Sequence, residues 1–245
     1  MDNSEEKEKY YLDYLNSSRY ELLTPLNGIH GLSCILRDSP DMSAGDRQQI
    51  CEFLEESCFR IGSMIDDFFE STKIHFALLK PHLAEVKINK LLMQVCRNFE
   101  PDARKKGLNL AIKNPSPDGE DILETDCGLI TEIFKHLIKN AIRYTIEGSV
   151  EIGYNHGKDH FEFFVRDTGI GIPTECRGKI FTPYYHADNI SEKMAGRGSG
   201  LGLWFCKTYV DMLGGSIRVE SEEDKGSVFL FMIPVNARRE ENPLP

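Results

Sequence analysis

The chain has 245 residues, of which 40% are hydrophobic, and a formal net charge of −10 at neutral pH. This length allows one large or two small domains, and an acidic balance without a basic run argues against a nucleic-acid groove. The seven cysteines include no Cys-x-x-Cys pair, which indicates reduced thiols and argues against a zinc site. No apolar run is long enough for a membrane span. We therefore expect a cytoplasmic chain without direct membrane contact, either free or as the intracellular portion of a membrane sensor.

Residues 1–80 are predicted to form two long antiparallel helices, because apolar residues recur at alternating three- and four-residue spacings. The first seam comprises Leu12, Leu15, Leu22, Leu26, Ile29 and Leu36, and the second comprises Ile50, Leu54, Ile61, Met64 and Phe68. Pro40 lies in the break between them, and Ser43 with Asp46 predicts the N-cap of the second helix. Each helix buries only one stripe, so we expect a homodimer that forms a four-helix bundle. Packing of the hairpin against the following domain is the alternative.

Beyond residue 80, short strand-like segments alternate with helices. Strands are expected at residues 86–88, 108–112, 150–154, 161–165, 217–220 and 228–233, and helices at residues 89–98, 127–144 and 201–213. This mixture predicts an α/β sandwich over residues 81–237 and an α+β chain as a whole. Residues 185–197 are polar and aperiodic, which predicts a mobile lid. Residues 238–245 are expected to form a disordered tail.

Two glycine-rich stretches carry the clearest chemical signal. In the first, Asp167 precedes Gly169 and Gly171. The glycines of the second are Gly198, Gly200 and Gly202. A carboxylate can accept a hydrogen bond from an adenine amino group, and glycines let the backbone approach a ligand where a Cβ would clash. The second stretch opens a helix, whose free N–H groups suit phosphates. Together they predict an ATP pocket.

The predicted helix 127–144 adds a candidate metal ligand. His136 and Asn140 are four residues apart and therefore share one helix face. The amide oxygen of Asn140 suits Mg²⁺, a hard cation that is usually held by few protein groups together with phosphates. Arg143 is one turn further on, at a suitable place to reach a phosphate. For His136, contact with the metal or a phosphate and simple packing are equal alternatives.

The order of these stretches resembles that of the sensor histidine kinases of two-component signalling, and the resemblance covers nearly the whole chain. Asn140 matches the Mg²⁺-binding asparagine of the N box, and Asp167 matches the adenine-binding aspartate of the first G box. Residues 180–185 resemble the F box, and residues 214–229 resemble the closing hairpin. The resemblance implies ATP and Mg²⁺ as cofactors. It places at the nucleotide the residues His136, Asn140, Arg143, Tyr144, Asp167, Gly169, Gly171, Ile172, Gly198, Ser199, Gly200, Leu201 and Gly202.

The phosphoacceptor motif departs from the family pattern. Residues 20–26 resemble the H box, normally His-Glu-x-Arg-Thr-Pro-Leu, but Tyr20 stands at the histidine position and Leu23 replaces the basic residue. A tyrosine side chain with a pKa near 10 is a poor nucleophile at neutral pH, and Glu21 is the only obvious base. Tyrosine phosphate is also a far less reactive ester than phosphohistidine. We therefore expect phosphotransfer from ATP to this position to be lost or attenuated.

Two alternative functions remain open. Glu21 and Thr24 keep the Glu-x-x-Thr pattern that the family associates with dephosphorylation of a response regulator. The chain is then a regulatory pseudokinase or a regulator phosphatase that acts through its helical stem. The resemblance implies as partners a second copy, a response regulator receiver domain or another histidine kinase. The third class is an ATPase of the gyrase and heat-shock-90 type, but those enzymes carry a glutamate where this chain has His136.

Overall fold

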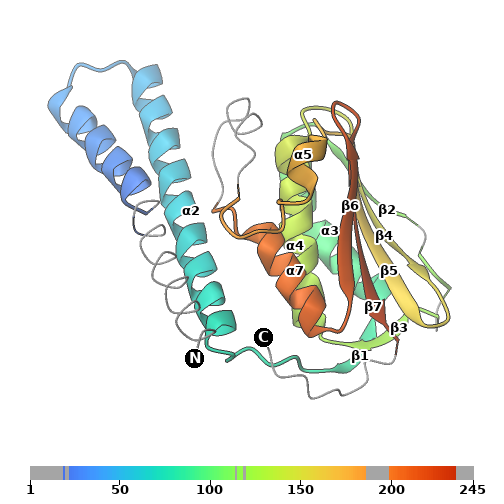
Figure 1. The fold of residues 1–245 in the computed structure, drawn as a ribbon. Helices are drawn as coiled ribbons and strands as arrows, with labels where there is room; N and C mark the ends of the chain where they lie inside the picture. The colour runs from blue at the N-terminus through green and yellow to red at the C-terminus, as the bar shows by residue number, and fades with distance from the viewer. Residues whose placement is uncertain (1–18, 20–21, 114, 118–119, 186–198, 236–245) are drawn as a thin grey trace. The chain divides into compact units, whose positions relative to one another are not determined.

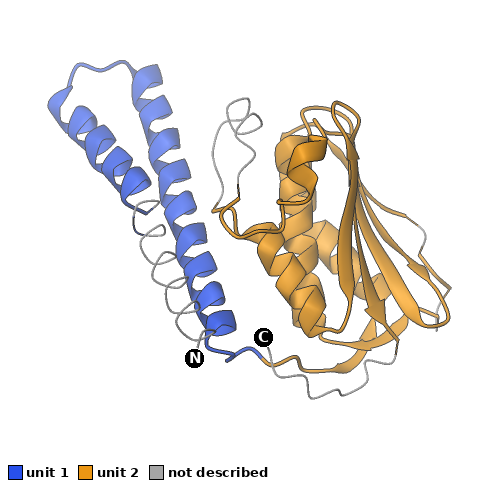
Figure 2. Ribbon diagram, viewed as in Figure 1, with its two compact units in different colours: residues 1–79 blue, residues 80–245 orange. Residues whose placement is uncertain are grey.

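The computed structural model describes residue 19 and residues 22–113, 115–117, 120–185 and 199–235. The chain divides into two compact units, Met1–Leu79 and Lys80–Pro245 (Figure 2). The first unit is helical and the second contains the strands, so the predicted α+β class is confirmed. Apart from Tyr185, the predicted lid lies outside the described residues, as does the predicted tail. No helix in the described part of the chain has both the length and the apolar character needed to cross a membrane.

The described part of the first unit contains two helices joined by a short connection. Residues 22–38 are helical, residues 39–43 connect, and α2 spans Ala44–His75 (Figure 1). The predicted N-cap of α2 is confirmed, because the Ser43 hydroxyl accepts a hydrogen bond from the Asp46 N–H over 3.1 Å. This contact satisfies one of the N–H groups that a helix start leaves without an intrahelical partner.

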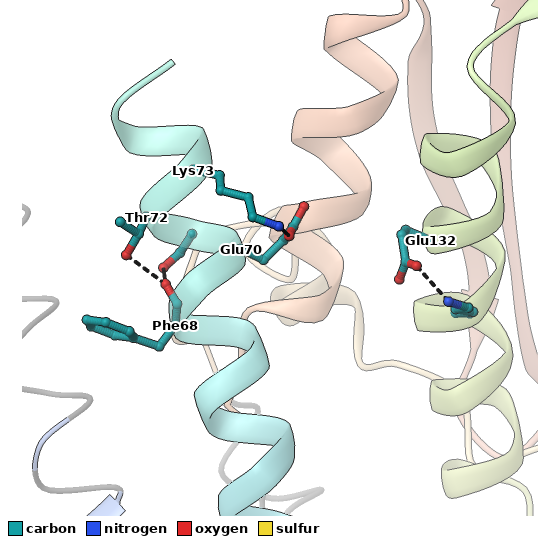
Figure 3. A network of polar contacts seen from close by, with 7 residues as sticks. Phe68, Glu70, Thr72, Lys73 and Glu132 are labelled. Carbon is teal, nitrogen blue, oxygen red and sulfur yellow. Dashed lines mark hydrogen bonds and ion pairs between the residues drawn. The ribbon is translucent and has the colours of Figure 1, made fainter. Parts of the chain in front are cut away.

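Polar side chains near the C-terminal end of α2 bond within the helix. The Thr72 hydroxyl donates to the Phe68 carbonyl over 2.8 Å, and Lys73 Nζ lies 3.0 Å from Glu70 Oε2 (Figure 3). A Glu–Lys pair three residues apart supports a helix by a few tenths of a kcal/mol, whereas a threonine hydroxyl that bonds four residues back does not add to helix stability. This part of α2 is thus held by contacts within the helix.

The two predicted seams behave differently. All members of the second seam are buried or half-buried, whereas Leu26 of the first seam is 52% exposed. On α2 a second stripe recurs at seven- and four-residue intervals, which places it on one helix face. We call this stripe the apolar face of α2; its members are Cys51, Cys58, Ile65, Phe69 and Phe76, all of them exposed. Among the described residues of the hairpin, apolar side chains are therefore exposed on both helices.

The second unit is built on a mixed sheet. In chain order its elements are β1 (Ala84–Lys87), α3 (Ile88–Lys105), β2 (Asn109–Lys113), β3 (Ile122–Thr125), α4 (Cys127–Tyr144), β4 (Ser149–His156), β5 (His160–Asp167), α5 (Thr174–Arg177), α7 (Gly202–Met212), β6 (Ser216–Glu222) and β7 (Gly226–Pro234). The main sheet has the order β2-β4-β5-β7-β6, with β2 parallel to β4 and the other pairs antiparallel. Strands β1 and β3 form a separate antiparallel pair. Helices α3, α4 and α7 cover one face of the main sheet (Figure 1).

The predicted strands are confirmed, and α4 has the predicted bounds. Strand β3 was not predicted. Helix α3 continues beyond the predicted residue 98 and through Pro101, because its last turns still bury Ala103, which is 1% exposed.

Helix α4 is anchored at both its start and its middle. Asp126 caps the helix by accepting a hydrogen bond from the Leu129 N–H over 3.0 Å. Further along, the Phe134 ring lies against two sheet residues, with centroid distances of 5.8 Å to Phe163 and 5.3 Å to Phe231. Buried aromatic pairs in this edge-on geometry add to the stability gained from area burial. The sheet thus holds α4 firmly and positions its C-terminal end.

Candidate functional site

Three segments meet at the C-terminal end of α4. The Ile170 N–H donates to the Tyr144 carbonyl over 3.2 Å, and the Asp224 N–H donates to the Ile170 carbonyl over 2.8 Å. Both backbone polar groups of Ile170 are therefore used, one by α4 and one by the turn between β6 and β7. The loop 167–172 is consequently fixed between these two elements. Side chains from separate sequence motifs therefore lie together at one corner of the unit.

Asp167 is buried in this corner. The residue is 6% exposed, and its Oδ1 accepts backbone N–H bonds from Gly169 over 2.9 Å and from Ser227 over 3.3 Å. Burial raises the pKa of Asp167, and the two N–H donors oppose that rise. Oδ2 accepts no hydrogen bond from any residue that the structure describes. This oxygen can accept a hydrogen bond from the amino group of a ligand.

The two glycines after Asp167 are required by the backbone around them. A Cβ on Gly169 would lie 2.4 Å from the Tyr144 carbonyl oxygen. A Cβ on Gly171, where φ is +68°, would lie 2.0 Å from the Glu222 carbonyl oxygen. The sequence interpretation attributed these glycines to close approach of a ligand. The structure adds a different reason, which is that the loop packs directly on α4 and on the β6–β7 turn.

Two serines that the sequence interpretation did not single out complete the loop. The Ser221 hydroxyl accepts a hydrogen bond from the Ile172 N–H over 2.8 Å and lies 2.9 Å from both the Gly226 carbonyl and the Ser227 hydroxyl. Ser227 in turn donates its N–H to Asp167. The available signal was their place in the segment that resembles the closing hairpin. They fix Ile172 and Asp167 relative to each other.

Asn140, Arg143 and Tyr144 lie in the last turns of α4. Asn140 is half-buried, and its amide makes no hydrogen bond with another described residue. The Arg143 guanidinium carbon lies 5.9 Å from the centroid of the Tyr144 ring. In the described ranges no group of three or more His, Cys, Asp or Glu side chains is arranged to hold a metal ion. A cation at Asn140 would therefore need oxygens from a bound phosphate, as Mg²⁺ sites in proteins commonly do.

His136 lies against the start of α7. Its ring centroid is 5.4 Å from that of Phe205, and a Cβ on Gly202 would lie 3.1 Å from its Nδ1. Just before α7, the Gly200 carbonyl accepts the Tyr184 N–H over 3.0 Å, and the Ser199 hydroxyl accepts the Leu201 N–H over 3.3 Å. The described part of the second glycine turn therefore adjoins α4 through His136.

The remaining predicted residues lie outside the described ranges or in the first unit. Gly198, Tyr20 and Glu21 lie outside the described residues. Thr24 belongs to the first unit, where it is exposed on the helix 22–38.

The comparison with known proteins begins with a family match over residues 125–237, described as Histidine kinase-, DNA gyrase B-, and HSP90-like ATPase. The matched segment begins just before α4 and ends just after β7, so it contains the whole corner. The chain is also 33% identical over 239 residues to Autoinducer 2 sensor kinase/phosphatase LuxQ of Vibrio vulnificus. That alignment covers 95% of this chain but 27% of the relative. The chain thus spans about a quarter of the length of LuxQ.

Solved structures agree with this match. The catalytic domain of histidine kinase ThkA is 30% identical, with a TM-score of 0.53, and the alignment covers 64% of this chain and 97% of that domain. ThkA in complex with response regulator protein TrrA has a TM-score of 0.74 at 23% identity, covers 93% of this chain and 63% of that one, and supports the fold alone. Full-length ShkA in complex with AMPPNP is 26% identical with a TM-score of 0.64, over 92% of this chain and 47% of that chain.

Proposed function

The chain belongs to the sensor histidine kinase family and carries that family's ATP-binding domain, and from this premise we propose that it is a kinase core with an altered acceptor. Residues 1–80 act as the dimerisation and acceptor-like hairpin, and residues 81–237 bind ATP. Phosphotransfer to the H-box position is lost or attenuated because Tyr20 stands there. The observation that carries the ATP-binding part is that Asp167 Oδ2, in the same corner as Asn140, accepts no hydrogen bond from a described residue.

The nucleotide is oriented by groups from three segments. The adenine amino group donates to Asp167 Oδ2, while Gly169 and Ser227 hold the opposite oxygen of that carboxylate. Arg143 offers a guanidinium to phosphate oxygens. The N–H groups at the start of α7 face the same negative charge. The AMPPNP complex of ShkA supports a nucleotide of this class.

Asn140 is the protein ligand that we assign to Mg²⁺. A half-buried amide without a hydrogen-bond partner among the described residues fits an oxygen donor for a hard cation. When bound, Mg²⁺ neutralises charge on the phosphates. Arg143, one helical turn later, approaches the phosphates from the same helix.

The acceptor position explains why the reaction is altered. In the family, an imidazole nitrogen forms a bond to the γ-phosphorus while the bond from that phosphorus to the bridging oxygen breaks and ADP leaves. Tyr20 offers a hydroxyl that is protonated at neutral pH. A phosphotyrosine ester would also not pass its phosphoryl group downhill to an aspartate. ATP binding and acceptor chemistry are therefore separable in this chain.

A calorimetric titration tests the nucleotide site. We expect Mg²⁺-ATP to bind the intact chain and Asn140→Ala to lose the Mg²⁺-dependent part of that affinity. Asn109→Ala, which removes the same amide from an exposed position on β2, is the matched control. No binding by the intact chain would refute the proposal, and unaltered metal dependence in Asn140→Ala would remove Asn140 from the site.

The partners follow from the first unit. A second copy covers the apolar face of α2 and the exposed Leu26, so that the two hairpins form a four-helix bundle in the cytoplasm. The bundle in turn offers a surface to a response regulator receiver domain or to another histidine kinase. The complex of ThkA with TrrA supports the first of these partners.

Regulator dephosphorylation is the second candidate function. Two observations favour it: Thr24 is exposed on the helix 22–38, and the relative LuxQ is named a sensor kinase/phosphatase. Here Glu21 and Thr24 orient a water toward the phosphoaspartate of a regulator, which needs no histidine. We expect the chain to accelerate loss of phosphate from a receiver domain charged with acetyl phosphate, and Thr24→Ala to abolish that effect. An equal rate with Thr24→Ala would refute this second function.

A further inference from the structure

The C-terminal end of α4 presents carbonyl groups that need hydrogen-bond donors from outside the helix. The last carbonyls of an α-helix lack intrahelical N–H partners and carry its negative dipole end. Here the Ala141 carbonyl is used by Thr145, which donates both its N–H and its hydroxyl. The Tyr144 carbonyl is used by the Ile170 N–H. The carbonyls of Ile142, Arg143 and Thr145 remain.

Lys106 supplies all three missing donors. Its Nζ lies 2.8 Å from the Ile142 carbonyl, 2.8 Å from the Arg143 carbonyl and 3.2 Å from the Thr145 carbonyl. An ammonium group has three protons, so every donor of this side chain has an acceptor on one helix end. Lys106 is far from this end in sequence and comes from the cap of α3.

The backbone around Lys106 fixes the place from which the ammonium reaches α4. Its N–H bonds back to the carbonyls of Asp102 and Ala103, which ends α3. Gly107 then turns the chain with φ at +72°, and the Leu108 N–H returns to the Ala103 carbonyl over 2.9 Å. This is a helix C-terminus closed by a left-handed glycine. Lys106 is therefore presented from a fixed turn rather than from a free loop.

The position of this positive charge matters for a nucleotide. Asn140 lies about one turn before the end of α4 and Arg143 lies within the last turn, so the phosphates in the proposed function approach a helix end whose carbonyls repel them. The pKa of Lys106 is lowered by burial of its ammonium and, second, by the charge of Arg143. The ammonium is therefore close enough to the phosphate-facing end of α4 to share its electrostatic environment.

We propose that Lys106 is a positioning residue for the triphosphate: by occupying three carbonyls at the end of α4, it cancels the negative charge that would otherwise oppose phosphates beside Asn140 and Arg143. This inference rests on the proposed ATP-binding function. It assigns to Lys106 no contact with the nucleotide, because its three donors are already used. The contribution of Lys106 to affinity must therefore increase with the negative charge of the ligand.

The test compares ATP with adenosine, which has no phosphate. In Lys106→Met we expect affinity for Mg²⁺-ATP to fall on the order of threefold to tenfold, and affinity for adenosine to change by less than about twofold. Lys106→Arg, which keeps the charge, should restore most of the loss. Lys105→Met is the control, because it removes the same charge one residue earlier, and the Lys105 side chain has no hydrogen bond or ion pair among the described residues.

The outcomes separate this inference from the proposed function. An equal loss for ATP and adenosine, or no loss in Lys106→Met, would overturn the electrostatic role while ATP binding by the intact chain still stood. A loss in Lys105→Met as large as that in Lys106→Met would also overturn it. If Lys106→Met fails to fold by circular dichroism, Lys106→Gln takes its place with the same expected ratio. Absence of ATP binding in the intact chain would refute the proposed function, and this inference with it.

Discussion

The backbone N–H of Ile170 donates to the carbonyl of Tyr144 over 3.2 Å and so joins the loop that carries Asp167 to the helix that carries Asn140. The two residues that we assign to the adenine and to the metal are thus fixed to each other through a single peptide group. The carbonyl of Ile170, in the next peptide group, accepts the Asp224 N–H of the β6–β7 turn. A shift of any one of these elements must move the other two.

Asp167→Asn should weaken ATP binding. The substitution keeps an acceptor for Gly169 and Ser227 but removes the ionised oxygen that faces the ligand. Hydrogen bonds to charged groups are worth about 1.5–3 kcal/mol, so we expect affinity to fall by roughly 10- to 100-fold. Calorimetry measures this directly, with Asp159→Asn as an exposed control. Unchanged affinity would refute the adenine role of Asp167.

The same substitution should change how stability depends on pH. Burial raises the pKa of Asp167 in the folded chain above its value in the unfolded chain. As the pH rises through the interval between these two pKa values, the unfolded chain loses its proton first, so folding stability falls. Above the pKa of the folded chain, the full loss of folding stability caused by the buried carboxylate is present. Below the pKa of the unfolded chain, this loss is absent.

We therefore expect Asp167→Asn to be more stable than the parent chain at neutral pH, and the difference to shrink on acidification toward the unfolded pKa. Urea unfolding at several pH values measures both quantities. A parent chain that is the more stable of the two at neutral pH would contradict this account of Asp167.

Gly171→Ala should damage both the fold and the site. The new methyl group would lie 2.0 Å from a backbone oxygen at a residue whose φ is +68°, so the loop or the β6–β7 turn must move. We expect a loss of at least about 2 kcal/mol in unfolding free energy and weaker ATP binding. Gly178→Ala is the control, because nothing lies within 4 Å of its added Cβ. Equal urea midpoints for the two variants would show that the loop is not tightly packed.

Phe69→Glu should dissociate the dimer. Phe69 is 59% exposed and lies on the apolar face of α2, so a charge there would be buried without a partner in the bundle. Gln49→Glu adds the same charge to another, polar face of α2. We expect light scattering to give a monomer for Phe69→Glu and for residues 81–245 alone, and a dimer for Gln49→Glu. A dimer from residues 81–245 would overturn the bundle assignment.

The elements of the fold could be predicted where local periodicity is strong. Helix α4 was predicted to its bounds, and the structure adds an N-cap at Asp126. Strand β3 was missed because its sequence, Ile-Leu-Glu-Thr, does not alternate apolar and polar residues, although Leu123 and Thr125 are its buried positions. The sequence predicted that the seam residue Leu26 needs cover but could not say which copy of the chain supplies it, and Leu26 is exposed in one copy.

In the site too, features that are local in sequence could be predicted, and contacts between distant residues could not. Asp167 and its glycines are close in sequence, and together with the second glycine-rich stretch they predicted a nucleotide pocket. Ser227 bonds to Asp167 across 60 residues, and Lys106 reaches the end of α4 across 36 or more. Contacts of that range depend on how strands and helices pack, so the spacing of residues within a short segment does not predict them.

Incubation with γ-labelled Mg²⁺-ATP tests the central claim, which is that a working ATP domain is joined to a hairpin without the usual acceptor. The comparison uses the parent chain, Tyr20→His and Tyr20→Phe. We predict that Tyr20→His alone becomes labelled, with a label that is labile in acid and stable in alkali. Two results would contradict the account: no label on Tyr20→His although ATP binds, or an acid-stable label on the parent chain that Tyr20→Phe lacks.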